Sequence, residues 1–74
     1  MNASELRKLR ESLGMSRDDL AELLCLSGYS SVMNIETGFR KPSKLAVRLL
    51  RYLESLPKAK ALAHIEELKR HDPK

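Results

Sequence analysis

The chain has 74 residues, which suffice for one small domain and are too few for two. Lys and Arg number 14 against 10 Asp and Glu, and the net charge of +4 suits a polyanionic partner such as nucleic acid. Cys25 is the single cysteine, which excludes an intrachain disulfide. The sequence starts without the apolar core of a signal peptide, and no run approaches the roughly 20 apolar residues of a membrane span. We therefore expect a soluble protein of the cytoplasm.

Apolar residues recur three or four positions apart in the first third of the chain, which is the spacing of helices with one buried face. We predict a first helix over residues 3–13, ended by Gly14. A second helix is predicted from Ser16, which has the spacing of a capping box to Asp19, as far as Cys25. The residues expected to be buried on these two helices are Leu6, Leu9, Leu13, Leu20, Ala21, Leu23 and Leu24.

Three further helices are predicted in the rest of the chain. The third spans residues 29–37 and is ended by Gly38, the fourth runs from its cap Ser43 to about Leu56, and Pro57 takes the first position of the fifth. Their apolar faces carry Val32, Ile35, Leu45, Leu49, Leu50, Leu53, Ala61, Leu62, Ile65 and Leu68. No segment alternates with the period of a strand, so the predicted fold class is all-α, a bundle of five short helices.

Two charged residues fall on the apolar faces of predicted helices. Arg10 follows Leu6 by four residues on the first helix, and Glu36 follows Val32 by four residues on the third. A single inward charge is costly, whereas two opposite charges can satisfy each other. We therefore expect an ion pair that joins the first and third helices. The alternative is that both charged groups reach solvent at the edge of the core.

Two short helices joined by a tight turn, the second with a polar outer face, form a helix-turn-helix. The major groove of DNA admits one α-helix, and each base pair presents its own donors, acceptors and methyl groups there. A helix that contacts these groups needs amide, hydroxyl or apolar side chains near its N-terminal end. The predicted third helix has such side chains, and the candidates for base contacts are Tyr29, Ser30, Ser31, Met33 and Asn34.

The same region resembles the Cro/CI-type (XRE) helix-turn-helix repressors. The resemblance is carried by four motifs in order, Leu6-x-x-Leu9-Arg10, Leu13-Gly14-Met15-Ser16, Leu20-Ala21-x-x-Leu24 and Val32-x-x-Ile35-Glu36-x-Gly38-x-Arg40-x-Pro42-Ser43. It covers about residues 4–56, and the inward Arg–Glu pair of the family falls on Arg10 and Glu36. It implies a compact five-helix domain of the lambda-repressor-like type, with the helix-turn-helix in the second and third helices, that binds double-stranded DNA.

The resemblance also implies which residues contact DNA phosphates on either side of the recognition helix. These are Ser16, Arg17, Arg40, Lys41 and Lys44. Phosphate contacts set affinity and register, whereas base contacts set sequence preference.

Besides Ile35, an ordinary core substitution where many relatives have tryptophan, the chain departs from the family pattern at three places. Cys25 stands where relatives usually have glycine, and a positive φ there is expected to cost about 1 kcal/mol. One extra residue lies before Val32, where Gly28 can absorb it and where either Ser27 or Ser30 can cap the third helix. A third departure is Phe39, whose position is usually polar. It can pack on the DNA backbone, on a dimer partner or on the helices of its own chain, and we expect the last.

The resemblance implies a homodimer on a palindromic operator, because small repressors of this kind generally act as two-fold dimers. Residues 1–56 are the expected DNA-binding core, and residues 57–74 are the expected dimerisation helix and short tail of the same domain. The expected dimer face consists of Tyr52, Leu56, Leu62, Ile65 and Leu68. The alternative is that the apolar stripe of the last predicted helix covers the core of its own chain. We expect the chain to be a dimeric autorepressor, similar to those that phages encode, including beside anti-CRISPR genes, and to lie in the host cytoplasm or on the nucleoid.

An antitoxin, which binds a partner toxin and represses its own operon, is the alternative, and the neighbouring genes distinguish the two. An enzyme is not expected, because Cys25 has no evident activating base and no Gly-rich phosphate loop is present. His64 and His71 are seven residues apart, which is too far for an ordinary chelating pair, so no metal and no cofactor is expected either.

Overall fold

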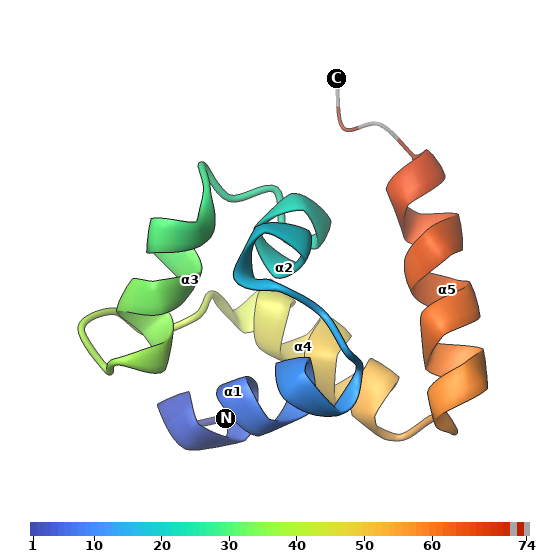
Figure 1. The fold of residues 1–74 in the computed structure, drawn as a ribbon, viewed down its shortest axis with the longest axis horizontal. Coiled ribbons are helices and arrows are strands. Elements are labelled where there is room, and N and C mark those ends of the chain that lie inside the picture. The colour runs from blue at the N-terminus through green and yellow to red at the C-terminus, as the bar shows by residue number, and fades with distance from the viewer. Residues whose placement is uncertain (72, 74) are drawn as a thin grey trace.

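The computed structural model describes residues 1–71 and 73, and this part of the chain contains five α-helices and no strand (Figure 1). The helices are α1 (Ala3–Ser12), α2 (Arg17–Leu23), α3 (Tyr29–Glu36), α4 (Lys44–Glu54) and α5 (Lys58–Arg70). The predicted all-α fold is confirmed, and each predicted helix is present. The predicted C-terminal tail includes residues 72 and 74, which lie outside the described residues. No helix in the described ranges is both long enough and apolar enough to span a membrane.

Local side-chain caps begin three of the helices. The predicted capping box is present, since Ser16 Oγ accepts the N–H of Asp19 at 3.0 Å and Asp19 Oδ2 accepts the N–H of Ser16 at 3.1 Å. Ser43 Oγ accepts the N–H of Ala46 and caps α4 as predicted. A second capping box, between Asn2 and Glu5, begins α1, and its Asn-x-x-Glu spacing was visible in the sequence. These caps explain why helix starts were predictable from nearby residues.

Positive φ angles end α1, α2 and α3. Gly14 has φ +70° and Gly38 has φ +82°, a region that glycine adopts without strain. Cys25 has φ +58°, so the turn of the helix-turn-helix contains the left-handed residue that the family pattern predicts, without glycine there.

Two predicted helix starts are wrong in detail. Neither Ser27 nor Ser30 caps α3, because the chain enters this helix through Gly28 in an extended conformation, and no side chain provides a cap. The Ser27 hydroxyl instead hydrogen-bonds the Ser31 hydroxyl at 2.8 Å. We predicted Pro57 as the first residue inside the fifth helix, but it is the N-cap of α5, which begins one residue later at Lys58.

The helices pack around the α2–α3 pair. α1 packs against α3, and α5 packs against both α2 and α4. In Figure 1, α3 and α5 lie on opposite sides of the molecule, with α2 and α4 between them. This arrangement leaves the outer side of α3 open to a ligand.

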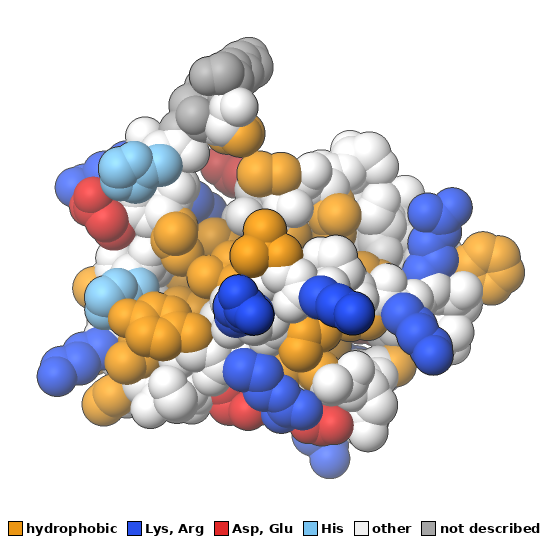
Figure 2. All heavy atoms as spheres, turned by 180° about the vertical axis from the view of Figure 1, so that it is seen from behind, with side chains coloured by type: hydrophobic (Ala, Val, Ile, Leu, Met, Phe, Trp, Pro, Cys, Tyr) orange, Lys and Arg blue, Asp and Glu red, His pale blue; other side chains and the backbone are white. Residues whose placement is uncertain are grey.

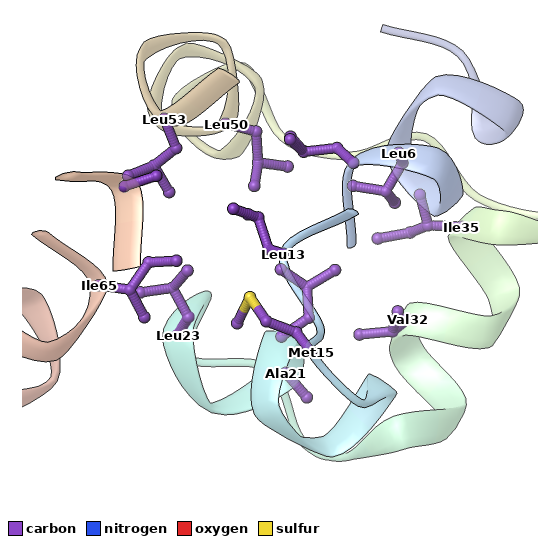
Figure 3. Close-up of a cluster of buried hydrophobic side chains, with 13 residues drawn as sticks. Leu6, Leu13, Met15, Ala21, Leu23, Val32, Ile35, Leu50, Leu53 and Ile65 are labelled. Atoms are coloured by element: carbon purple, nitrogen blue, oxygen red, sulfur yellow. The ribbon is translucent and has the colours of Figure 1, made fainter. Parts of the chain in front are cut away.

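The core draws on all five helices (Figure 3). It consists of Leu6, Leu9, Leu13, Met15, Leu20, Ala21, Leu23, Val32, Ile35, Leu50, Leu53, Ala61 and Ile65. On α4 the predicted core residue Leu45 is instead 74% exposed, and on the predicted apolar stripe of α5 Leu62 and Leu68 are 36% and 37% exposed. The buried face of α4 is fixed by Leu50 and Leu53, and Leu45 lies on a different side of that helix.

Candidate nucleic-acid interface

The orientation of α3 is set by its two apolar residues. Val32 is fully buried and Ile35 is 7% exposed, so the opposite side of the helix faces outward. Among the predicted base-contacting residues, Tyr29 and Ser30 are exposed, and Ser31, Met33 and Asn34 are half-buried. The arrangement brings these side chains to the outer side and N-terminal end of one helix, as recognition of the major groove requires.

A groove of about 500 Å³ lies between α3 and the segment that leads into α4. Its polar lining consists of Ser27, Ser30, Ser31, Asn34, Arg40, Lys41 and Ser43. The fold therefore places predicted base-contacting residues of α3 beside two of the predicted phosphate-contacting residues.

The cations that follow α3 are not neutralised by neighbouring carboxylates. Arg40, Lys41 and Lys44 are exposed, and none forms an ion pair with the carboxylates of residues 1–71. Arg48 lies one helical turn after Lys44 and is likewise exposed and without an ion pair to the carboxylates of residues 1–71, although it was not among the residues predicted from the sequence. The face of the molecule seen in Figure 2 carries a band of Lys and Arg side chains. Such a band attracts polyanions.

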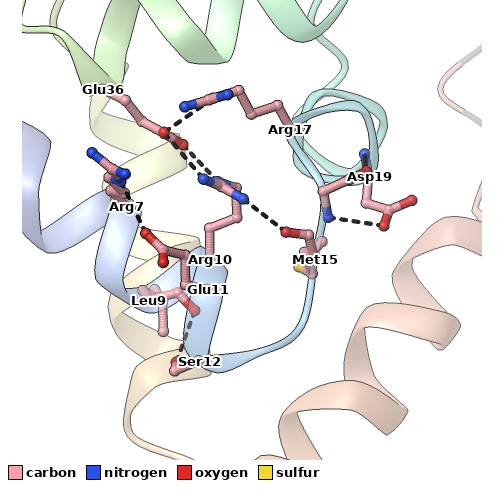
Figure 4. A network of polar contacts seen from close by, with 10 residues as sticks. Arg7, Leu9, Arg10, Glu11, Ser12, Met15, Arg17, Asp19 and Glu36 are labelled. Carbon is pink, nitrogen blue, oxygen red and sulfur yellow. Dashed lines mark hydrogen bonds and ion pairs between the residues drawn. The ribbon is translucent and has the colours of Figure 1, made fainter.

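The predicted ion pair between Arg10 and Glu36 is present at the centre of a polar network (Figure 4). Arg10 Nε donates to Glu36 Oε2 at 2.7 Å, and Arg10 Nη2 donates to Oε1 at 3.3 Å. The Glu36 side chain is only 2% exposed and that of Arg10 is 11% exposed, so the alternative in which both reach solvent is excluded. The pair ties α1 to α3 and holds the recognition helix against the core.

The pKa of Glu36 reflects competition between burial and the arginines. Burial raises the pKa, but hydrogen bonds and positive charge from Arg10, with a smaller contribution from Arg17, outweigh it. The pKa of Glu36 therefore lies below its ordinary value, and the carboxylate is ionised at neutral pH. The hydrogen bonds that Arg10 donates to Glu36 in turn raise the pKa of Arg10.

Both residues predicted to contact phosphate before α3 form hydrogen bonds within the protein. Arg17, the first residue of α2, donates Nε to Glu36 Oε1 at 3.2 Å, a second arginine contact that sequence reasoning missed. No short-range pattern shows it, because the two residues are 19 positions apart. Ser16 is exposed and its hydroxyl oxygen caps α2, while its O–H donates to no acceptor among residues 1–71 and 73.

One residue of the expected dimer face is buried within its own chain. Ile65 is 3% exposed and belongs to the core of its own chain, so its predicted role at a dimer interface is wrong. The helical face that carries Ile65 is covered by α2 and α4 within the same molecule.

The four other predicted dimer residues border different parts of the fold. Leu56 lines a groove beside α1, and Leu62 lines one beside the α1–α2 turn. Leu68 borders the end of α2. Tyr52 is 48% exposed and packs edge-on against the His64 ring, with centroids 5.6 Å apart.

Phe39 also departs from expectation. We expected it to pack on the helices of its own chain, but its side chain is 78% exposed. It follows Gly38, whose φ of +82° reverses the chain at the end of α3 and carries residue 39 away from the core.

The fold and the surface together define a helix-turn-helix protein. A helix with a polar outer face follows a tight turn, and exposed cations without carboxylate partners follow that helix, as in proteins that bind the major groove.

Comparison with known families supports the same assignment. A family model described as helix-turn-helix matches residues 6–57, and the chain belongs to this family, of the XRE type that its motifs predict. No curated protein and no solved structure matches the chain. The chain is therefore a DNA-binding transcription regulator.

Proposed function

We propose that the protein is a homodimeric repressor that binds an inverted-repeat operator, including that of its own gene. The observation that supports this proposal is the position of cations on both sides of α3. Arg17 lies at the start of α2, and Arg40, Lys41 and Lys44 follow α3. Cations in these positions hold the two phosphate backbones while the helix between them enters the major groove.

Within α3, the side chains differ in what they offer a base pair. The amide of Asn34 suits adenine, to which it can both donate and accept a hydrogen bond. The thioether of Met33 suits the methyl group of thymine, and the hydroxyls of Tyr29 and Ser30 suit several acceptors. The hydroxyl of Ser31 already pairs with Ser27, so Ser31 shapes the groove more than it selects a base.

For the dimer we propose a face centred on Tyr52, in place of the face that includes the buried Ile65. Leu45, Leu49 and Tyr52 follow one another at intervals of four and three residues, so they share one side of α4. Leu45 and Tyr52 are 74% and 48% exposed, and His64 of α5 packs beside Tyr52. Burial of such an exposed leucine against apolar side chains is favourable, and in a two-fold dimer the same face of a second copy provides those side chains.

Repression requires only that the bound dimer occlude the promoter. The association with phage genes, including those of anti-CRISPR operons, belongs to this proposal and rests on the resemblance of the motifs. Sequencing the adjacent genes tests it, since phage genes support the autorepressor and a toxin gene favours the antitoxin.

Selection of binding sites from a random duplex library, with pure protein at physiological salt, tests the proposed function. We expect enrichment of an inverted repeat with half-sites about 10 base pairs apart, one turn of DNA. Binding that depends on salt alone, without an enriched sequence, contradicts a sequence-specific repressor. Sedimentation equilibrium of the same sample measures the dimer, and a monomer on DNA contradicts the two-fold arrangement.

A further inference from the structure

Arg10 and Arg17 both reach the carboxylate of Glu36, but they are engaged to different degrees (Figure 4). Arg10 uses all three guanidinium nitrogens inside the protein, because its Nη1 also donates to the carbonyl oxygen of Met15 at 2.9 Å. Arg17 donates only its Nε, at 3.2 Å, and its side chain is 38% exposed. Within residues 1–71 and 73, the two terminal nitrogens of Arg17 make no hydrogen bond.

The charges of this cluster do not balance. Arg10 alone neutralises Glu36, whose lowered pKa keeps it ionised at neutral pH. Arg17 therefore leaves one positive charge in excess. A single anion at the terminal nitrogens of Arg17 would complete both the charge balance and the hydrogen bonds.

We propose that Glu36 positions Arg17 for contact with a DNA phosphate. The hydrogen bond from Arg17 Nε to Glu36 Oε1 holds one edge of the guanidinium plane, and the opposite edge presents two nitrogens in a fork that matches phosphate oxygens. Glu36 is 2% exposed and does not itself touch DNA, so it acts through Arg17. This inference rests on the proposed function, because the anion is a phosphate of the bound DNA.

The direction in which Glu36→Gln changes DNA affinity distinguishes positioning of Arg17 from a general effect of net charge. Glu36→Gln raises the net charge by one, and general electrostatics alone then strengthens DNA binding. Positioning has the opposite consequence, because the neutral amide of glutamine holds Arg17 less firmly than the carboxylate does, so the side chain loses more rotamer freedom when it binds. The two effects therefore predict opposite changes in affinity.

The experiment measures affinity for one fixed duplex by fluorescence anisotropy, across a salt range of about 50 to 200 mM. The variants are Arg17→Gln, Glu36→Gln and the double substitution, each first shown to be folded by circular dichroism. Loss of the phosphate contact in Arg17→Gln should weaken binding about tenfold and lower the slope of log K against log salt by about 0.9 per bound protomer. Glu36→Gln should weaken binding about threefold when Arg17 is present and less than about twofold when it is absent.

Two further variants make the result specific. Glu67→Gln, on α5, adds the same charge at a side chain that is 61% exposed, and should bind at least as tightly as the wild type. Arg17→Lys keeps the charge and the Arg10–Glu36 pair but has a single nitrogen, so it should recover less than half of the loss in binding free energy seen in Arg17→Gln. If Glu36→Gln does not fold, the affinity of Arg17→Lys still tests the inference.

A folded Glu36→Gln variant that binds as tightly as the wild type overturns the inference, as does an Arg17→Lys variant with wild-type affinity. If the wild type binds DNA and Arg17→Gln binds equally well, the inference fails while the proposed function stands. If the wild type binds no duplex, the proposed function fails and the inference fails with it.

Discussion

Replacing Glu36 by alanine removes the acceptor shared by two arginines and leaves Arg10, whose side chain is only 11% exposed, without its counter-charge. Three hydrogen bonds are lost, and Arg10 keeps only its bond to the Met15 carbonyl oxygen. Breaking a buried ion pair by removing one partner typically costs about 3–5 kcal/mol. For a domain of this size each kcal/mol lowers Tm by about 4–8 °C, so we expect Tm to fall by at least about 12 °C.

Urea denaturation followed by circular dichroism measures this loss as a change in the free energy of unfolding. The matched control is Glu11→Ala, which breaks the exposed Arg7–Glu11 pair on α1. An exposed pair at this spacing contributes only about 0.3–0.5 kcal/mol. A Glu36→Ala variant within about 1 kcal/mol of the wild type would refute the inference that the pair is structurally buried.

Three other predictions follow from the same structure. Because the folded-state pKa of Glu36 is lowered, its contribution to stability is complete above the ordinary value of 4.5 and is lost as the pH falls through the lower folded value. Acid titrations of unfolding should therefore show a shallower loss of stability in Glu36→Gln than in the wild type, and equal slopes would contradict this. Cys25→Gly relieves a φ of +58° and should stabilise the fold by up to about 1 kcal/mol in thermal unfolding, whereas Cys25→Val should destabilise it. In sedimentation equilibrium, Tyr52→Glu should give a folded monomer and Leu62→Glu should remain dimeric, whereas Ile65→Glu should unfold because Ile65 is in the core. If Leu62→Glu is monomeric and Tyr52→Glu is dimeric, the interface lies elsewhere.

The helices and their ends were predictable because the interactions that set them are local. Ser16 and Asp19 are three residues apart, and so are Ser43 and Ala46, so each cap shows in a short window of sequence. The start of α3 was not predictable in the same way. Gly28 enters the helix without a side-chain cap, and two nearby serines looked like better candidates.

The charged cluster was only half predictable. Helical periodicity placed both Arg10 and Glu36 on buried faces, and their opposite charges implied that they meet. Arg17 has no such signal, because it lies at a helix start and is partly exposed. Its contact with Glu36 depends on how α2 is placed against α3, which no pattern within α2 contains.

Residue spacing along the chain was enough to predict an all-helical fold, the positions of its helices, and a polar helix after a tight turn that can enter a DNA groove. Spacing within a helix and capping between neighbours carry that information over a few residues. The tertiary structure decided which apolar side chains remain outside the core. Ile65 and Leu45 are both apolar and both lie in helices, yet one is buried and the other exposed, because burial depends on which helices pack against each face. Those packing partners are distant in the chain, and only the folded arrangement of all five helices specifies them.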